Sequence, residues 1–476
     1  MNWFKYFSFA VLVLIFCIIG NSNFSKTVKR NIASDCSSLE EKLINQFNLY
    51  ENARLSAMTT GSIFSRSQWE DKLAPDKNCD FSPKDIAKLQ SMHKKIIDEN
   101  HKLAVKNSLI KTKFIKSKKL EAKFCQELPK GGVLHLHPSG VIDNQTLKEL
   151  GVRDTSPFFL SHSQHSFSDF DRIFSPLRGL LGSGLTPNQK YVIKKYLERA
   201  KKEKVIYVEF SKLFTPSLSE DAVLSNWSKE FFDETGIIVK WKNGFIRAWD
   251  ETSLRSQFNS LIESEYKFRK KTGLDQFPDL VGIDLYGNEN SGTMLEKGQH
   301  LYSQLFAMRN NQHYKGWSSK LYMTAHAGEL GDPRNSRDAM IFGVDRIGHG
   351  VLLADQPVNL EYARIYNNGK GLPIEINLHS NYILSSVDSY ENHPFLTFLR
   401  LNLPVSFSTD DEGIFQSTIS TECELALKYT NIEYSELKQM SYNSIHTSFT
   451  DEETKGHLLS TLDKMFDEFE KKWTNI

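Results

Sequence analysis

From residue 129 onward the sequence alternates short apolar runs with longer segments of mixed polarity, and this alternation restricts the fold more than any other feature. Repeated strand and helix units of this kind build parallel sheets covered by helices. Eight units match a (β/α)8 TIM barrel, although an open doubly wound α/β sheet shows the same alternation. The eight runs span residues 131–137, 204–210, 236–249, 280–287, 321–326, 344–350, 372–381 and 403–410.

Polar residues at the ends of these runs favour the closed barrel. His137, His326, His349 and Asp410 stand at or beside the ends of runs one, five, six and eight. Only a closed barrel brings the ends of its first, fifth and eighth strands around one centre. We therefore predict an α/β fold in which residues 129–476 form a (β/α)8 barrel, with terminal helices from Thr421 onward.

Four of these polar residues form a candidate metal site. His135 and His137 are two positions apart, so both point to the same face of an extended strand. His326 supplies a third imidazole and Asp410 a carboxylate. An isolated His-x-His is more often a structural pair, but three imidazoles and one carboxylate suit a divalent ion, with zinc favoured and iron or manganese as alternatives.

Three further residues are candidates for proton transfer and substrate contact. Glu329 follows Ala327 and Gly328, and a carboxyl in a dry metal-bearing pocket can deliver a proton at neutral pH. As an isolated residue it could equally begin a helix. His349 lies between two glycines and is expected to orient or deprotonate water. Asp411 leaves the strand in a different direction from Asp410 and is expected to face the substrate.

These residues predict a metal-assisted attack of water on an electrophilic carbon. Amide hydrolysis and deamination of an aromatic amine use the same attacking water, so the residue pattern leaves both reactions open.

The motifs resemble the adenosine deaminase family. Between Pro129 and about Phe449 the resemblance is carried, in the order of the family, by Pro-Lys-Gly-Gly at 129–132, His-Leu-His at 135–137, Gly-Ile-Asp-Leu-Tyr-Gly-Asn-Glu at 282–289, His-Ala-Gly-Glu at 326–329, Arg-Ile-Gly-His-Gly at 346–350 and Ser-Thr-Asp-Asp at 408–411. The N-terminal segments and the lead-in at 129–132 are similar to the secreted, growth-factor-related branch.

The resemblance implies one zinc ion on His135, His137, His326 and Asp410, and deamination of adenosine or 2'-deoxyadenosine to the inosine product and ammonia. It implies that Glu329 protonates the purine ring nitrogen beside the attacked carbon. His349 and Asp410 would hold and deprotonate the water. Asp411 and the backbone amide of Gly287 would contact the purine.

The sequence departs from the family pattern on the side where the sugar binds. Pro138 and Ser139 follow His137 where the family commonly has an acidic residue that meets the ribose. Residues 375–381 read Glu-Ile-Asn-Leu-His-Ser-Asn instead of Glu-x-Cys-Pro-x-Ser-Asn, and Glu412 replaces a proline. Another 6-aminopurine, or a related barrel amidohydrolase reaction, is therefore the alternative.

Composition gives no sign of a nucleic-acid partner. The 59 Lys and Arg residues nearly cancel the 58 Asp and Glu residues, so no strong global field attracts a polyanion. The expected partner is a small purine nucleoside. A barrel that has lost catalysis and acts as an extracellular binding or signalling protein is the non-enzymatic alternative.

The N-terminus predicts export. Lys5 precedes an apolar run at 7–20, which has the layout of a signal peptide over residues 1–22 and is short for a membrane span. No stable membrane span is expected after cleavage, although an uncleaved anchor is the alternative. Cleavage would leave Cys36, Cys79, Cys125 and Cys423, which allow three full disulfide pairings.

Residues 23–128 predict a helical N-terminal extension. Its part at 94–123 is rich in lysine, and Leu103, Leu109, Ile110, Phe114 and Leu120 are spaced for one amphipathic helix. A solvated helix face is the plain interpretation, and a contact with a polyanion or a membrane surface is the alternative. We also expect a homodimer formed through these helices.

Overall fold

The structure is a computed structural model, and it describes residues 36–60, 64–75, 77–182, 184–213, 218–274, 277–310 and 319–475. The predicted signal peptide at 1–22 and the first part of the predicted extension lie outside the described residues. Among the described helices, none has the combination of length and apolar character that is needed to cross a membrane.

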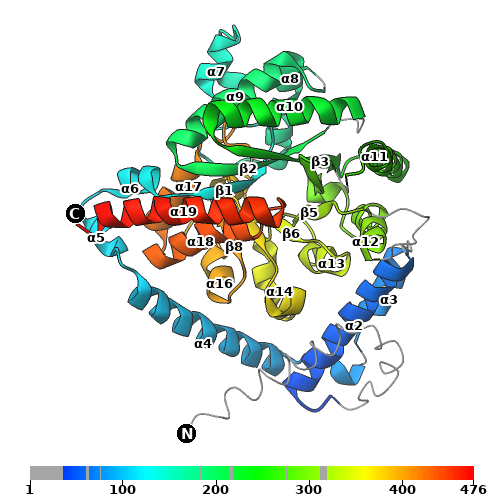
Figure 1. Cartoon of the computed structure of the whole chain (residues 1–476). Helices are drawn as coiled ribbons and strands as arrows, with labels where there is room; N and C mark the ends of the chain where they lie inside the picture. The colour runs from blue at the N-terminus through cyan, green and yellow to red at the C-terminus, as the bar shows by residue number, and fades with distance from the viewer. Residues whose placement is uncertain are drawn as a thin grey trace.

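Eight parallel strands pair in the order of the sequence, and this confirms the barrel (Figure 1). An isolated bridge between Leu136 and Asp410 links the first strand to the segment after the last one. A doubly wound sheet would place its strands in a different order. The strands are β1 (Gly131–Leu136), β2 (Val205–Lys212), β3 (Ile238–Ile246), β4 (Leu280–Tyr286), β5 (Tyr322–Ala327), β6 (Arg346–His349), β7 (Ile374–Ile376) and β8 (Val405–Phe407).

Helices cover the outside of the barrel, so the strands are buried on both faces and consist mainly of apolar residues. The helices that follow β1 and its successors are α7 (Asn144–Glu149), α8 (Phe167–Leu181), α9 (Pro187–Lys202), α10 (Leu218–Thr235), α11 (Glu251–Thr272), α12 (Tyr302–Asn310), α13 (Asn335–Ile341), α14 (Pro357–Gly369), α15 (Leu378–Ile383), α16 (Phe395–Arg400), α17 (Ile419–Tyr429), α18 (Tyr434–His446) and α19 (Glu452–Trp473). The last three are the predicted terminal helices.

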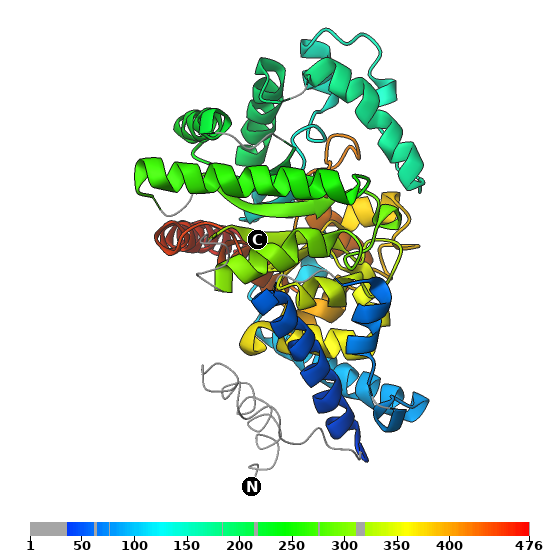
Figure 2. The same ribbon diagram turned by 90° about the vertical axis from the view of Figure 1, so that its right-hand side faces the viewer.

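The N-terminal helices pack along the barrel, the first three at the end of the molecule opposite α7 and α8 and the last two at its side near α17 (Figure 1 and Figure 2). They are α2 (Leu39–Thr60), α3 (Arg66–Leu73), α4 (Pro83–Asn107), α5 (Thr112–Ser117) and α6 (Glu121–Glu127). Helix α2 lies against α12 and α13, and α4 lies against α14, α16 and α18. Buried hydrogen bonds fasten this contact: Tyr50 to Asn359 at 2.9 Å and Trp69 to Gln299 at 3.0 Å.

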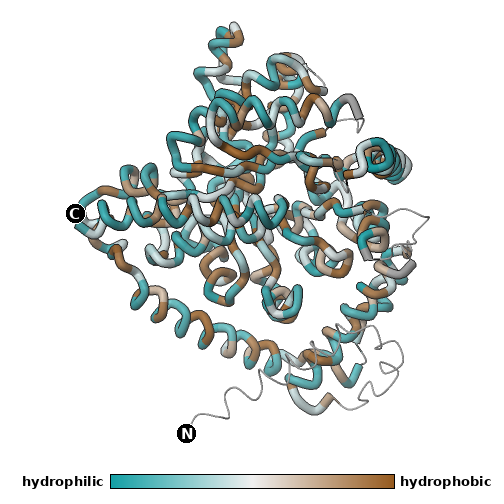
Figure 3. Tube along the Cα trace, viewed as in Figure 1, coloured by the Kyte–Doolittle hydropathy of each residue, from teal (hydrophilic) through white to brown (hydrophobic). Residues whose placement is uncertain are grey.

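The prediction of one amphipathic helix over 94–123 was wrong. Helix α4 ends at Asn107, and α5 and α6 follow as separate short helices. The apolar residues do not share one buried face, because Leu103 and Leu109 are 51% and 63% exposed whereas Ile110 is buried. In Figure 3, α4 alternates hydrophilic and hydrophobic residues along its length.

The seventh predicted strand is shorter than expected. Only Ile374–Ile376 pairs in the sheet, and the residues from Leu378 to Ile383 turn into α15. Because the chain turns here, the side chains of Ser380 and Asn381 reach Asp410 and His349. A longer extended strand would carry them away from these residues.

One disulfide lies within the N-terminal extension, and a second joins the extension to the C-terminal helices. Cys36 pairs with Cys79, and Cys125 of α6 pairs with Cys423 of α17. The sequence left three pairings open, and the structure selects this one. The second bridge closes a loop over a sequence separation of 298 residues, so the extension and the C-terminal helices are covalently linked.

Candidate active site

The predicted metal ligands meet at the C-terminal ends of the strands. His135, His137, His326 and Asp410 are all buried, and one ligand atom from each lies within 4.8 Å of the others. His135 and His137 come from the end of β1, His326 from β5 and Asp410 from the segment after β8. This is the end of a barrel at which active sites lie.

His135 is oriented by a carboxylate behind it. Its Nδ1 lies 2.9 Å from Glu375 Oε2, while its buried Nε2 has no hydrogen-bond partner and lies 3.5 Å from Asp410 Oδ1. Burial alone would lower the pKa of His135, but Asp410 and Glu375 raise it to about 10. The two carboxylates therefore favour positive charge at this ring, and a divalent cation bound there would be attracted by the same carboxylates.

His326 is held in the neutral form that a metal ligand requires. Burial and the neighbouring His135 lower its pKa to about 4. Its Nδ1 lies 3.3 Å from Asp284 Oδ1, and its backbone carbonyl accepts a hydrogen bond from Arg247. An imidazole whose other nitrogen meets a carboxylate is the usual arrangement around a metal in proteins.

Asp410 has a left-handed backbone, with φ 59°. Its amide donates to the carbonyl of His135 at 3.1 Å, and its Oδ2 accepts from the Ser380 hydroxyl at 2.8 Å. Residues other than glycine adopt this conformation at a cost of about 1–3 kcal/mol, and only where the surroundings enforce it. Burial raises the pKa of Asp410, but hydrogen bonds to His135 and His137 hold it well below its ordinary value.

The donor set fits a divalent metal such as zinc. Three imidazoles and one carboxylate converge, and the buried Nε2 of His135 has no protein partner. Buried polar atoms without a partner are rare in folded proteins and need an explanation, which a metal ion bound by these residues would supply. Imidazole and carboxylate are donors that zinc takes in proteins, and a catalytic zinc site keeps a position for water beside its protein ligands.

Glu329 is the candidate proton donor of the site. Burial, Asp410 and Glu289 raise the pKa of its carboxyl well above the ordinary value, which favours the protonated form. Its Oε1 is buried without a partner. The carboxylate of Glu289 accepts hydrogen bonds from the amides of Gly328 at 3.0 Å and Glu329 at 2.7 Å, and these bonds hold the turn that presents Glu329.

His349 lies beside the metal ligands. Its ring is 4.8 Å from that of His135 and 5.0 Å from that of His326, and burial followed by these two histidines lowers its pKa well below the ordinary value. A Cβ at Gly348 would lie 2.7 Å from the ring of His135, so this glycine makes room for a metal ligand.

The backbone that follows His137 packs closely against the side chain of Asp411. A Cβ at Gly140 would lie 1.6 Å from Asp411 Oδ1, so no other residue fits there. Burial and Asp410 raise the pKa of Asp411 well above its ordinary value, and its Oδ1 is buried without a partner. Pro138 is buried and Ser139 half-buried on this same segment.

Gly287 follows β4 directly, in a left-handed conformation with φ 91°. The preceding residue, Tyr286, places its ring 4.7 Å from that of His137. The structure thus brings the β4 end next to the metal ligands, while the contact of the Gly287 amide with a purine stays a prediction.

Sequence reasoning assigned no role to the residues that position the site. Asp284 and Glu375 orient two histidines, Glu289 holds the turn before Glu329, and Ser380 and Asn381 contact Asp410 and His349. One signal was available, because Asp284 and Glu375 are charged residues inside otherwise apolar strands. Such residues must find partners when they are buried.

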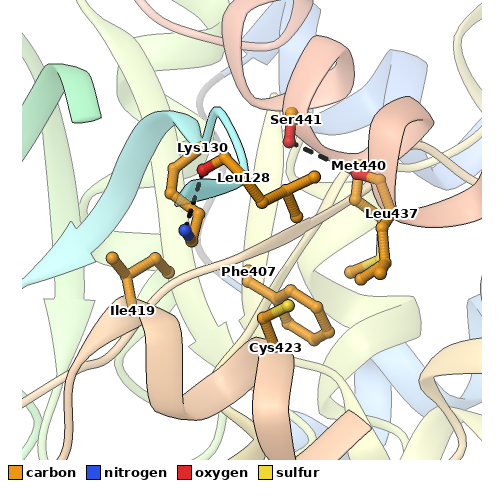
Figure 4. Close-up of a pocket in the computed structure, with 8 residues that line it drawn as sticks. All are labelled: Leu128, Lys130, Phe407, Ile419, Cys423, Leu437, Met440 and Ser441. Atoms are coloured by element: carbon orange, nitrogen blue, oxygen red, sulfur yellow. Dashed lines mark hydrogen bonds between the residues drawn. The ribbon is translucent and has the colours of Figure 1, made fainter. Parts of the chain in front are cut away.

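Two hollows elsewhere do not match this chemistry. A cavity of about 20 Å³ lies outside the barrel between Lys130, Phe407 and Cys423 (Figure 4), and it holds at most about one water molecule. Lys130 is buried there, donates to the carbonyl of Leu128 at 2.9 Å and has its pKa lowered to about 7 by burial. The second hollow adjoins Tyr322, the first residue of β5, at the opposite end of that strand from His326.

Comparison with known sequences agrees with these motifs. The sequence model of the family described as adenosine deaminase matches residues 129–465. An adenosine deaminase of Clostridium perfringens strain SM101 is 28% identical over 338 residues, which cover 68% of this chain and 95% of that protein. One from Clostridium botulinum strain 657 is 25% identical over 337 residues, with coverages of 68% and 96%.

Solved structures share the fold. An amidohydrolase from Burkholderia ambifaria with bound Zn superposes with a TM-score of 0.59 at 21% identity, covering 75% of this chain and 95% of that one. An adenine deaminase from Arthrobacter aurescens gives 0.54 at 19% identity, with coverages of 71% and 99%. The N6-methyl-AMP deaminase from Arabidopsis thaliana gives 0.56 at 23% identity, with coverages of 72% and 98%.

Proposed function

The chain belongs to the adenosine deaminase family, and from that premise we propose that it is a zinc-dependent enzyme that deaminates adenosine or 2'-deoxyadenosine. It is a hydrolase that acts on adenosine-type substrates by purine deamination. The observation that carries the proposal is Glu329, a buried acid with a raised pKa and an unpartnered oxygen beside the His and Asp cluster.

His135, His137, His326 and Asp410 would hold the zinc ion. Bound zinc supplies Lewis acidity, which makes water a nucleophile at neutral pH.

The chain's own residues then carry the protons. Asp411 and the backbone amide of Gly287 orient the purine. Glu329 gives its proton to the ring nitrogen beside the carbon that bears the amino group, so the carbon becomes electrophilic. Water adds to this carbon while His349 and Asp410 hold it and take up its proton. The proton taken from water passes to the amino group, which leaves as ammonia, and the hydroxyl proton on the attacked carbon returns to Glu329 as the inosine product forms.

A different 6-aminopurine is the second candidate substrate, because Pro138 and Ser139 occupy the segment where the family commonly has an acidic residue. Neither side chain offers a carboxylate to a ribose hydroxyl. Two proteins of the same fold are named for other substrates, adenine and N6-methyl-AMP.

A substrate panel with metal analysis tests both candidates. Purified protein is incubated with adenosine, 2'-deoxyadenosine, adenine, N6-methyladenosine and adenosine monophosphate, and the ultraviolet change on deamination is followed while zinc is measured in the same sample. Fastest turnover of the two nucleosides supports the proposal, and fastest turnover of another compound supports the alternative. No turnover of any aminopurine by fully zinc-loaded protein would contradict both.

We also propose that the protein is exported and assembles as a homodimer through its N-terminal helices. Support for export comes from the signal-peptide layout at 1–22 and from two disulfides, which form in oxidising compartments. N-terminal sequencing of protein recovered outside the cytoplasm should begin near Asn23. Light scattering should give twice the chain mass, and a monomer at all concentrations would contradict the dimer.

A further inference from the structure

We propose that His393 and Asn381 form a hydrogen-bond relay that fixes the tautomer of His349, with the ring proton on Nε2. His393 lies just before α16, Asn381 lies in α15, and both side chains are buried. His349 therefore meets any ligand at Nε2 as a hydrogen-bond donor. His393 and Asn381 act through His349 and are positioning residues.

The relay begins at a backbone amide, which can act only as a hydrogen-bond donor. The backbone amide of Phe395 lies 3.2 Å from His393 Nδ1, and a backbone N–H can only donate. His393 Nδ1 is therefore an acceptor. Burial lowers the pKa of His393 to about 3, so its ring is neutral. A neutral imidazole carries one proton, which must then lie on Nε2.

The next step orients the amide of Asn381. His393 Nε2 lies 3.0 Å from Asn381 Oδ1. The two ends of an amide look alike in shape, and the hydrogen-bond network decides between them. Because His393 Nε2 donates, the oxygen of Asn381 must face it. The amide nitrogen then points the other way, toward His349.

The last step sets the tautomer. Asn381 Nδ2 lies 2.9 Å from His349 Nδ1, and an amide NH2 group donates but does not accept. His349 Nδ1 must therefore offer its lone pair, and the proton of the neutral ring lies on Nε2. This Nε2 is buried and has no protein partner.

Other neighbours of His349 Nδ1 do not oppose this assignment. Glu329 Oε1 lies 3.7 Å away, which is too far for a hydrogen bond. The amide nitrogen of Asn377 lies at 3.4 Å and is also a donor. Asn377 Oδ1 has no partner, so this amide is not oriented from behind as Asn381 is.

His349 and Asp410 were expected to share two roles, holding the attacking water and taking up its proton. The tautomer assigns these roles to different residues. A donor at Nε2 can hold a lone pair of the attacking water but cannot take up its proton, so Asp410 is left as the acceptor. This division rests on the proposed function, whereas the tautomer itself does not.

Long-range 1H–15N spectra of protein labelled with 15N-histidine test the tautomer, because they report which ring nitrogen carries the proton. The chain has 14 histidines, and the signals of His349 are those lost in His349→Asn. We expect a protonated Nε2 in both the zinc-loaded and the zinc-free protein. A proton on Nδ1 in the wild type would overturn the proposal without any variant of the relay.

Variants of His393 separate the relay from packing. His393→Gln keeps a donor toward Asn381, whereas His393→Phe fills the space without one. We expect His393→Phe to move the His349 proton and lower kcat by about 10- to 100-fold, and His393→Gln to retain the tautomer and most of the activity. Equal kcat and an unchanged tautomer in His393→Phe would overturn the relay.

Two further proteins complete the design. Asn381→Asp offers only acceptors to His349, so it should place the proton on Nδ1 even if His393→Phe does not fold. His457→Phe, at an exposed position of α19, is the matched control and should leave both readouts unchanged. A wild type with the expected tautomer but no deaminase activity would contradict the proposed function and leave the relay standing.

Discussion

The barrel contains two clusters of buried charge that share strand β6 but differ in how their atoms are partnered. The site cluster, at the strand ends, comprises the four proposed metal ligands with Glu329, His349 and Asp411. The inner cluster lies within the strands and comprises Glu209, Lys242, Arg346 and Glu375.

The inner cluster is internally satisfied. Arg346 Nε donates to Glu375 Oε1 at 2.6 Å, and its Nη1 donates to the carbonyl of Thr447 at 2.7 Å. Lys242 donates to the carbonyl of Leu134 at 2.6 Å. In the described part of the chain, none of the buried side-chain atoms without a partner belongs to these four residues. Buried charges that are fully paired hold the fold in one arrangement.

The site cluster has unpartnered atoms on four residues, namely His135 Nε2, Glu329 Oε1, His349 Nε2 and Asp411 Oδ1. Glu375 joins the two clusters, because one oxygen meets Arg346 and the other meets His135. The comparison teaches that burial of charge alone does not identify a site. Several unpartnered atoms beside a group of possible metal ligands do identify one.

Removal of the metal should have the largest effect, and it should act on the site cluster alone. Chelation should abolish activity, and zinc should restore it. At free zinc 1,000 times its Kd, the metal adds about 4 kcal/mol to the free energy of unfolding, so the melting temperature should fall on chelation. Calorimetry and a rate assay with and without chelator measure both. An unchanged melting temperature together with full activity after chelation would show that the site cluster does not need a metal ion.

Glu329→Gln should lower kcat by about 10²- to 10⁴-fold, because the side chain keeps its shape but loses its acidic proton. Zinc content and melting temperature should stay as in the wild type, since the substitution keeps the size of the side chain and changes none of the four proposed metal ligands. The control is Glu468→Gln on the exposed surface of α19, which should be fully active. A rate above a tenth of the wild-type value would remove Glu329 as the proton donor.

Arg346→Met should affect stability first, because it leaves Glu209 and Glu375 buried without their shared partner. Breaking a buried pair in this way costs about 3–5 kcal/mol, measured by denaturant unfolding. Arg172→Met, at a side chain that is 72% exposed, is the control and should change stability by less than about 0.5 kcal/mol. A normal unfolding curve for Arg346→Met would mean that the inner cluster does not hold the barrel.

Glu265 tests whether one unpartnered atom is enough to make a site. It lies in α11, outside both clusters; its Oε2 accepts from Ser319 at 2.7 Å and its Oε1 has no partner. Burial raises its pKa from 4.5 to about 7, so the folded protein binds a proton that the unfolded chain releases between these values. Stability from this group is present below about pH 4.5 and declines as the pH rises to about 7, by about 3 kcal/mol.

Glu265→Gln should therefore be more stable than the wild type at pH 8, show little difference at pH 5, and keep full activity. Thermal unfolding across this pH range measures the effect, with the exposed neighbour Glu263→Gln as control. Loss of activity in Glu265→Gln would contradict the rule that a single unpartnered buried atom does not identify a functional site.

Much of the fold and the site's central residues could be predicted from local patterns. The eight strands follow from runs of apolar residues, and His135, His137, His326 and Asp410 follow from their places at the ends of those runs. These signals work because strand burial and side-chain direction depend on neighbours only a few residues away.

Contacts between distant segments needed the tertiary structure. Nothing near Cys125 specifies Cys423 as its partner, and nothing near His349 points to Asn381 or His393. The role of Gly348 likewise depends on a histidine from another strand. Local sequence decides which elements form and which residues stand at their ends. Closure of the barrel decides which of those residues meet, because partners in a buried hydrogen-bond network are chosen by distance in space.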